Sequence, residues 1–350
     1  MKPITYYWQS LNFVSLALSP LSAVFCLLVS VRRFLYRFGW IKSNTPRLPV
    51  IVVGNIYIGG NGKTPFVIWL AEQLTAAGYK PGIVSRGYGA QNQQQVPDTW
   101  PRQVSLDQDV RLFGDEPYLI HQLTRCPVII DPLRSRAVKK VETESDCDVI
   151  ISDDGLQHYA MSRFIEINIS DARRLYGNGL CLPAGPLREP VSRLKTVDYI
   201  VYNISQGYSA KFMSLSHDNE FTMAYEISTL LPLSDKTEQS MTVGDFKGKI
   251  VHAVAGIGEP ENFFRVLKNY GLKVIEHPFD DHYQYRREDL LFDETYPIIM
   301  TEKDAVKCRF LFSESSFSQA GCWYLPIKAV IDRTLLAAIL KQLKTYSQPS

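Results

Sequence analysis

Several patterns that would place this sequence in a protein class are missing from its 350 residues. The six cysteines are scattered, with no Cys-x-x-Cys pair and no regular spacing. A disulfide framework and a zinc site are therefore not indicated, and reduced thiols of a cytoplasmic protein are favoured. A formal net charge of +2 gives no sign of a nucleic-acid partner. No internal repeat is evident, and the chain is long enough for two domains with separate cores.

Charge is also missing from a long N-terminal run, Leu11 to Val31. The run is about as long as the roughly 20 residues that a membrane-spanning helix needs. Arg32, Arg33 and Arg37 follow, interleaved with aromatic residues, which is typical of a membrane interface. We interpret residues 1–45 as a membrane-associated helix, spanning or lying on the membrane, with the rest of the chain cytoplasmic. A buried amphipathic helix and a signal peptide are the alternatives, the second disfavoured by arginines at the cleavage position.

The segment VGNIYIGGNGKTP lacks one glycine of a phosphate-binding loop. The pattern Gly-x-x-x-x-Gly-Lys-Ser/Thr lets backbone N–H groups surround phosphate oxygens, with the lysine on the β/γ phosphates and the hydroxyl on Mg²⁺. Here Tyr57 stands at the first glycine position. A glycine-rich turn without a ligand therefore remains possible from these residues alone. The candidate nucleotide-binding residues are Gly59, Gly60, Asn61, Gly62, Lys63 and Thr64.

Short apolar runs alternate with helix-length amphipathic stretches through most of the chain. This alternation predicts an α/β fold, namely a P-loop NTPase-like, mostly parallel sheet with helices on both faces. We assign this core to residues 46–205. Residues 206–247 read as a connector with short β-strands, and residues 248–350 as a smaller C-terminal α/β domain.

Acidic residues follow one of the predicted strands and recur in two other clusters. The run DVIISDD ends in Asp153 and Asp154, and ligands of open α/β sheets gather at such carboxyl ends. A carboxylate there can hold Mg²⁺. The other clusters are GDEP, with Asp115 and Glu116, and DDHYQY, with His282. For each cluster taken alone, a solvated turn or helix cap is the more common explanation, and spacing does not say which acid meets which histidine.

The motifs together are more specific than any one of them. VGNIYIGGNGKTP, VSRGYG, GDEP, VIISDDGLQH, LPAGPLREP, FDDHYQY and TEKDAVK occur in the order found in the tetraacyldisaccharide 4'-kinase family of lipid A biosynthesis. The sequence resembles a full-length member, from the N-terminal apolar run to about Lys307. The phosphate loop of that family also lacks the first glycine, so Tyr57 is not a defect.

The resemblance implies an ATP- and Mg²⁺-dependent lipid kinase at the cytoplasmic face of the bacterial inner membrane. It would transfer the γ-phosphoryl of ATP to the 4'-hydroxyl of a tetraacylated glucosamine disaccharide 1-phosphate, forming lipid IVA. No obligate protein partner is inferred. The implied roles are phosphate contact by Lys63, metal contact by Thr64, Asp153 or Asp154 and Glu116, a general base at Asp115 oriented by His282, and phosphate or headgroup contacts by Arg86 and Arg188.

Two other classes of function compete with this interpretation. A phosphate-loop switch or metallochaperone NTPase would suit the Gly-Lys-Thr loop, but it would usually carry metal-delivering Cys or His pairs. A membrane-anchored binding module without catalysis would not need the acid and histidine clusters. Lys303 of TEKDAVK is expected to start a helix, with lining of the cleft as the alternative.

Overall fold

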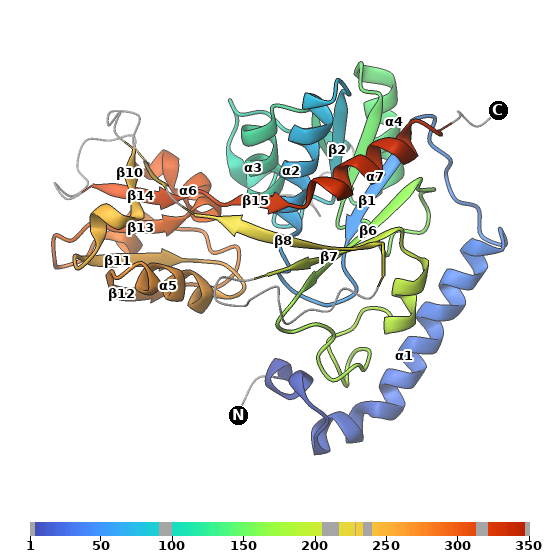
Figure 1. Cartoon of the computed structure of the whole chain (residues 1–350), viewed down its shortest axis with the longest axis horizontal. Coiled ribbons are helices and arrows are strands. Elements are labelled where there is room, and N and C mark those ends of the chain that lie inside the picture. The colour runs from blue at the N-terminus through green and yellow to red at the C-terminus, as the bar shows by residue number, and fades with distance from the viewer. Residues whose placement is uncertain are drawn as a thin grey trace.

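The computed structural model describes residues 4–90, 100–204, 217–227, 229–233, 240–312 and 321–346, so part of the predicted connector lies outside the described residues. These residues form two sheets, joined side by side (Figure 1). We call the nine-stranded sheet with its helices the large lobe and the six-stranded sheet with its helices the small lobe.

The large sheet has a parallel centre with an antiparallel strand at each edge. In spatial order its strands are β15 (Lys328–Ile331), β8 (Glu220–Glu226), β7 (Tyr199–Asn203), β6 (Ile165–Asp171), β1 (Val50–Gly54), β5 (Val149–Asp153), β2 (Pro81–Ser85), β4 (Val128–Ile130) and β3 (Arg102–Gln103). Its helices are α2 (Lys63–Ala76), α3 (Asp115–Thr124), α4 (Arg134–Glu144) and α7 (Arg333–Leu343).

Strand β1 explains why helices cover both faces of this sheet. Successive side chains of a strand point to opposite faces, and every residue of β1 is buried. Ile51 and Val53 join the cluster that includes Phe66 of α2, whereas Val50 and Val52 join the cluster that includes Val138 of α4. The predicted mostly parallel sheet with helices on both faces is therefore confirmed.

The small lobe is built on a second, mixed sheet. In spatial order its strands are β10 (Met241–Thr242), β9 (Thr229–Pro232), β14 (Cys322–Leu325), β13 (Ile298–Thr301), β11 (Ile250–Ala255) and β12 (Lys273–Pro278), with helices α5 (Pro260–Asn269) and α6 (Glu302–Cys308). Short 3₁₀ segments complete the described chain: η1 (Ile4–Gln9), η3 (Val110–Leu112), η4 (Val191–Thr196), η6 (Val243–Phe246), η7 (Arg287–Leu290) and η8 (Arg309–Phe312).

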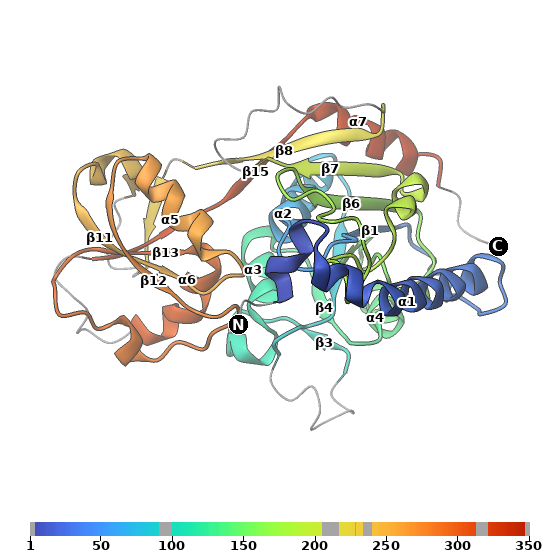
Figure 2. The same cartoon turned by 90° about the horizontal axis from the view of Figure 1, so that it is seen from below.

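The chain crosses between the lobes on β8 and returns on β15, and these two strands pair antiparallel (Figures 1 and 2). Strand β8 lies in the predicted connector, and it extends the large sheet beside β7. Strand β15 and helix α7 lie in the predicted C-terminal domain, yet Leu335 and Ile339 of α7 pack into the core of the large lobe. Residues 328–343 therefore belong structurally to the large lobe.

Helix α1 (Phe13–Arg37) carries its apolar side chains on the outside. It runs along the large lobe, away from the small lobe (Figure 1). Leu16, Leu21, Leu27 and Leu28 are each at least 58% exposed, and only 11% of the most apolar window is buried. The side that meets the protein is polar in part, because Ser22 donates a hydrogen bond to the Cys181 carbonyl at 2.7 Å. The alternative of a buried core helix is therefore wrong.

Candidate active site

The phosphate loop leads from β1 into α2, at the carboxyl edge of the parallel strands. Gly62 caps α2 with a φ of 87°, and a Cβ there would lie 2.3 Å from the Tyr225 hydroxyl and 2.6 Å from Asn203 Nδ2. Asn203 Nδ2 also donates to the Asn61 carbonyl at 3.2 Å. Side chains of β7 and β8 thus hold the loop, and only glycine fits at position 62.

Tyr57, at the position of the missing glycine, has a structural role. Its side chain is 8% exposed, and its backbone bridges to Leu187. The guanidinium of Arg174 lies 5.2 Å from the centre of the Tyr57 ring. Gly59, with a φ of 105°, and Gly60 have open space around them, so they supply the freedom that the loop needs further along.

Asp154 meets both Lys63 and Arg188. Lys63 Nζ lies 3.3 Å from Asp154 Oδ1, and Arg188 Nη1 lies 3.2 Å from Asp154 Oδ2. Burial alone would raise the pKa of Asp154, but the charges of Lys63 and Arg188 lower it to about 2. Two predicted phosphate contacts and one predicted metal ligand are thus gathered at the end of β5.

Asp153 is buried in a different electrostatic environment. Ser85, at the end of β2, donates to Asp153 Oδ2 at 3.2 Å, while Oδ1 has no hydrogen-bond partner among the described residues. Burial, followed by the carboxylates of Glu116 and Asp154, raises the pKa of Asp153 to about 6. A cation beside the free oxygen would stabilise the ionised form of this buried carboxylate.

These acids fit a magnesium ion that is shared with a nucleotide. Among the described residues, no three or more His, Cys, Asp or Glu side chains lie close enough together to hold a metal ion by themselves. Mg²⁺ does not require such a group, because it is usually held by one or two carboxylates, phosphate oxygens and water. Asp153 at the end of β5 and Thr64 at the start of α2 can supply the protein ligands.

Asp115 and His282 form a hydrogen-bonded pair across the two lobes. His282 Nδ1 lies 2.8 Å from Asp115 Oδ1 and 3.1 Å from Oδ2. Burial would raise the pKa of Asp115, but the hydrogen bond from His282 and the charge of Lys303 lower it to about 2. The same hydrogen bond raises the pKa of His282, against the opposing effect of burial. Asp115 is therefore an ionised acceptor.

Local backbone geometry fixes each member of this pair. Gly114 caps α3 with a φ of 86°, and a Cβ there would lie 2.4 Å from the Tyr88 carbonyl oxygen. Asp115 is thereby placed in the first turn of α3, where backbone N–H groups favour a negative charge. His282 adopts a φ of 63° in the loop after β12, and its ring lies 5.2 Å from the Tyr88 ring.

Lys303 joins the acids of both lobes. Its Nζ lies 3.0 Å from Glu116 Oε1, 3.1 Å from Asp281 Oδ1 and 3.6 Å from Asp115 Oδ2. Burial would lower the pKa of Lys303, but these carboxylates raise it. Lys303 does follow a helix N-cap, since α6 starts at Glu302, but it also lines the site. The spacing of TEKDAVK alone could not decide between these two roles.

A second group of cations lies beside the site. Arg134, in the first turn of α4, is 3% exposed and donates to the Asp153 carbonyl at 3.0 Å, while its Nε has no partner among the described residues. Arg86 is exposed after β2. Burial, helped by Arg134, Arg163, Arg32 and Arg86, lowers the pKa of His158 to about 4. The sequence analysis missed Arg134, whose only signal was its position at a helix start after an apolar strand.

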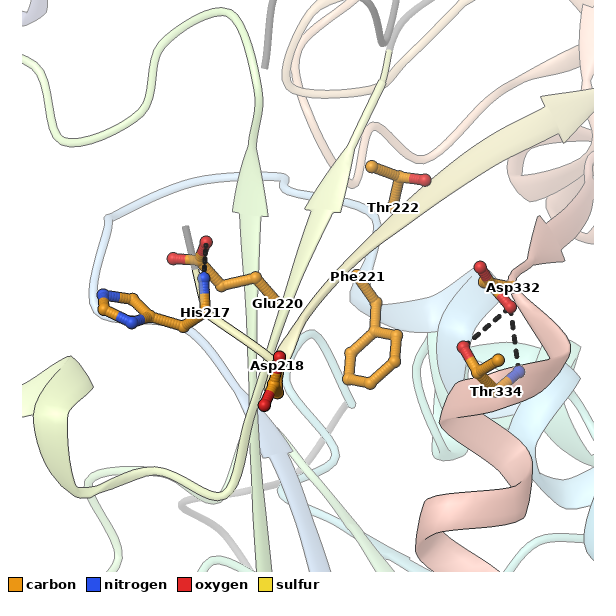
Figure 3. Close-up of a pocket in the computed structure, with 7 residues that line it drawn as sticks. All are labelled: His217, Asp218, Glu220, Phe221, Thr222, Asp332 and Thr334. Carbon is orange, nitrogen blue, oxygen red and sulfur yellow. Dashed lines mark hydrogen bonds between the residues drawn. The ribbon is translucent and has the colours of Figure 1, made fainter. Parts of the chain in front are cut away.

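A hollow of about 360 Å³ lies elsewhere, between the starts of β8 and α7 (Figure 3). His217 and Glu220 border it on one side, and Asp332 and Thr334 on the other. The start of β8 lies at the amino end of the parallel strands, opposite the phosphate loop. This hollow is therefore separate from the site.

Comparison with known proteins identifies the family of the chain. The family model for tetraacyldisaccharide-1-P 4'-kinase matches residues 14–344. The chain belongs to this family. A tetraacyldisaccharide 4'-kinase from Nitrosococcus oceani is 42% identical over 341 residues, which cover 97% of this chain and 94% of the relative. One from Alkalilimnicola ehrlichii is 44% identical over 313 residues, which cover 89% of this chain and 88% of the relative.

A solved structure shares the fold. It is an "apo" form of LpxK from Aquifex aeolicus in complex with ATP, 28% identical, with a TM-score of 0.77, covering 95% of this chain and 99% of that chain. Membership of the tetraacyldisaccharide 4'-kinase family confirms the predicted family and enzyme class. The chain is a kinase, so the switch and the non-catalytic binding module are no longer needed as interpretations.

Proposed function

We propose that this kinase transfers the γ-phosphoryl of ATP to the 4'-hydroxyl of a tetraacylated glucosamine disaccharide 1-phosphate, which forms lipid IVA. The pairing of Asp115 with His282, beside the acids that face Lys63, carries the proposal. A kinase needs a group that accepts the acceptor hydroxyl proton near the phosphate loop, and this carboxylate is buried, ionised and oriented.

The phosphate end of the site would work through fixed positive groups. The N–H groups of residues 59–64 and the Lys63 ammonium would bind the β- and γ-phosphates of ATP. Mg²⁺ bound by Thr64 with Asp153 or Asp154, and by Glu116, would neutralise phosphate charge during the transfer. Arg188 helps to keep Asp154 ionised. When Lys63 turns from Asp154 to the phosphates of ATP, Arg188 would remain as the positive partner of Asp154.

Asp115 would act on the acceptor. Its carboxylate would accept the hydrogen bond of the 4'-hydroxyl and take its proton as the oxygen–phosphorus bond forms. His282, held in the loop after β12, would keep the carboxylate aimed at the hydroxyl. Because the two residues come from different lobes, the pair is complete only when the lobes are together, which would limit transfer of phosphate to water.

Arg86, Arg134 and His158 would receive the 1-phosphate of the lipid. The Nε2 of His158 is buried and lacks a partner among the described residues, and the charges of Arg134 and Arg86 act with burial to lower the pKa of His158 to about 4. Arg134 Nε is buried and lacks a partner among the described residues, so an anion would satisfy it. Arg188, the other predicted headgroup contact, is engaged with Asp154 and serves the nucleotide side better.

Helix α1 would hold the kinase at the cytoplasmic face of the inner membrane. Its 25 residues are long enough to span a bilayer, yet Ser22 and Tyr36 contact the large lobe along the helix. A helix that lies against its own protein on one side fits an orientation in the membrane plane, with Leu21, Leu27 and Leu28 in the lipid. That orientation brings the site to the level of lipid headgroups.

The direct test is phosphorylation of a purified tetraacyl disaccharide 1-phosphate in detergent micelles with Mg²⁺ and ATP, with the product identified by ³¹P NMR and mass spectrometry. We expect a 4'-phosphorylated product from the native chain and at least about 100-fold lower turnover from Asp115→Asn and Lys63→Ala. Asp146→Asn, which affects an exposed pair with Lys80, is the matched control. ATP binding without product would mean that the acceptor is wrong.

A further inference from the structure

Arg174, in the turn after β6, contacts the phosphate loop directly. Its Nη2 donates to the Gly60 carbonyl at 2.5 Å and to Asn61 Oδ1 at 2.9 Å. The side chain is 15% exposed, and its guanidinium lies against the Tyr57 ring. Asp171 fixes the turn, because its Oδ1 accepts the backbone N–H of Arg174 at 3.0 Å. The guanidinium of Arg174 therefore has a fixed orientation before any ligand binds.

The other arm of the same guanidinium reaches the small lobe. Arg174 Nη1 pairs with Glu259 Oε1, and Arg173 Nη2 lies 3.2 Å from Glu259 Oε2. Glu259 directly precedes α5, and Asn262 Nδ2 donates to it at 2.6 Å. The carboxylate is thus held by its own helix and presented to two arginines of the large lobe.

The loop that carries Glu259 packs against Asp304 and against Asp281, the neighbour of His282. The loop from β11 to α5 begins at Gly256, whose N–H donates to Asp304 Oδ2 at 2.9 Å. A Cβ on Gly258 would lie 3.6 Å from Asp281 Oδ2. Within the small lobe, Glu259 and His282 are thus connected, and the two contacts to the large lobe, at Arg174 and at Asp115, are made together in this structure.

We propose that Arg174 is a positioning residue that couples the arrangement of the two lobes to the shape of the phosphate loop. With Glu259 in place, the guanidinium holds the Gly60 carbonyl and the Asn61 side chain by hydrogen bonds, which leaves the N–H groups of the loop free for the phosphates. Without Glu259 the guanidinium keeps only the longer contact with Asp171 Oδ2, at 3.6 Å, and holds the loop less firmly. The inference rests on the proposed nucleotide site.

Two measurements test this coupling on the full chain. Hydrogen–deuterium exchange of the peptide covering residues 59–64, without nucleotide, reports the order of the loop. Binding of a fluorescent ATP analogue with Mg²⁺ reports its function. The variants are Arg174→Ala, Glu259→Gln, their combination and Arg174→Lys. Arg173→Ala is the matched control, because it contacts the same carboxylate without touching the loop.

We expect Arg174→Ala and Glu259→Gln each to speed loop exchange and to weaken nucleotide binding about tenfold, as for one lost charge-assisted contact. The double variant should bind no more weakly than Arg174→Ala, because the two residues act through one contact. Arg174→Lys should fall between Arg174→Ala and the native chain, since one ammonium cannot replace the fork. In turnover assays the KM for ATP should rise while the KM for the lipid stays unchanged.

Native loop exchange in Arg174→Ala, or additive effects in the double variant, would overturn the coupling even if ATP binding and transfer proceed as proposed. An equal effect of Arg173→Ala would also overturn it, since a general attraction between the lobes would then explain the data. Failure of the native chain to bind the nucleotide would instead overturn the proposed function, and the exchange data would still decide the role of Arg174.

Discussion

His282 Nδ1 lies 2.8 Å from Asp115 Oδ1, although 167 positions separate the two residues in the chain. One comes from the loop after β12 of the small lobe, and the other from the first turn of α3 in the large lobe. The contact opposes the effect of burial on the Asp115 carboxylate and keeps it ionised. The charge state of Asp115 in its buried position therefore depends on a contact between the two lobes.

Replacing His282 by Ala should make turnover sensitive to acid. Without its hydrogen bond, burial is opposed mainly by Lys303, so the pKa of Asp115 should rise from about 2. A carboxylate with a raised pKa becomes protonated at a higher pH, so the acid-side decline of kcat should lie at a higher pH in the variant than in the native chain. Full pH profiles of kcat check this, with the exposed His217→Ala as control. Parallel profiles for native and variant would contradict it.

The sequence predicts those parts of the site whose residues lie next to a recognisable strand in the chain. The loop at Gly62 and the acids at the end of β5 follow apolar strands, so their common location follows from the parallel sheet. The pairing of Asp115 with His282 came only from family resemblance, because no local pattern links residues of different lobes. Arg174 and Glu259 belong to no motif, and only the structure brings them together.

The sequence also did not predict that the chain returns to the large sheet after the small lobe. Residues 328–343 form a strand followed by a helix, which looks like one more unit of the C-terminal α/β domain. They belong to the large lobe because β15 pairs antiparallel with β8, with Val330 opposite Ala224. Such a choice between two sheet edges depends on tertiary packing and leaves little signal in hydrophobic periodicity.

Gly62→Ala should weaken ATP binding. Gly60→Ala should leave ATP binding nearly unchanged, because a Cβ at position 60 meets no other atom. A Cβ at position 62 would lie 2.3 Å from the Tyr225 hydroxyl, and the φ of 87° strains any other residue. Position 60 has open space and no such φ. Titration with a fluorescent ATP analogue should show a loss of roughly tenfold or more for the first variant and near-native affinity for the second. Equal losses would mean that the Tyr225 contact does not set the shape of the loop.

Asp153→Asn should stabilise the protein when Mg²⁺ is absent. The folded pKa of Asp153 is raised to about 6, so its carboxyl contributes most to stability when protonated, and that contribution is lost as pH rises through 6. At pH 7.5 the native chain therefore holds a buried charge that costs on the order of 2 kcal/mol, and the amide removes it.

Thermal unfolding in a chelator at pH 7.5 and pH 5 measures this effect. The variant should have the higher Tm at pH 7.5, and the difference should shrink at pH 5, where the native carboxyl is protonated. Ser85→Ala, which removes the hydroxyl that donates to Asp153, should lower Tm at both pH values. If the native chain were instead the more stable of the two at pH 7.5, the protein's own groups would already stabilise the charge of the Asp153 carboxylate, and the prediction would be wrong.

Introducing charge on the outer side of α1 should release the protein from membranes without unfolding it. Leu21 and Leu28 are 58% and 63% exposed, so Glu at both positions leaves the packing of the protein core unchanged. Each buried leucine contributes roughly 1.5–3 kcal/mol, so partitioning should fall by at least about 100-fold. Sedimentation with anionic phospholipid vesicles measures this, and Leu291→Glu, at a site 58% exposed on the small lobe, is the control. Native sedimentation of the double variant would show that another surface binds the membrane, because α1 would then have lost its apolar face without effect.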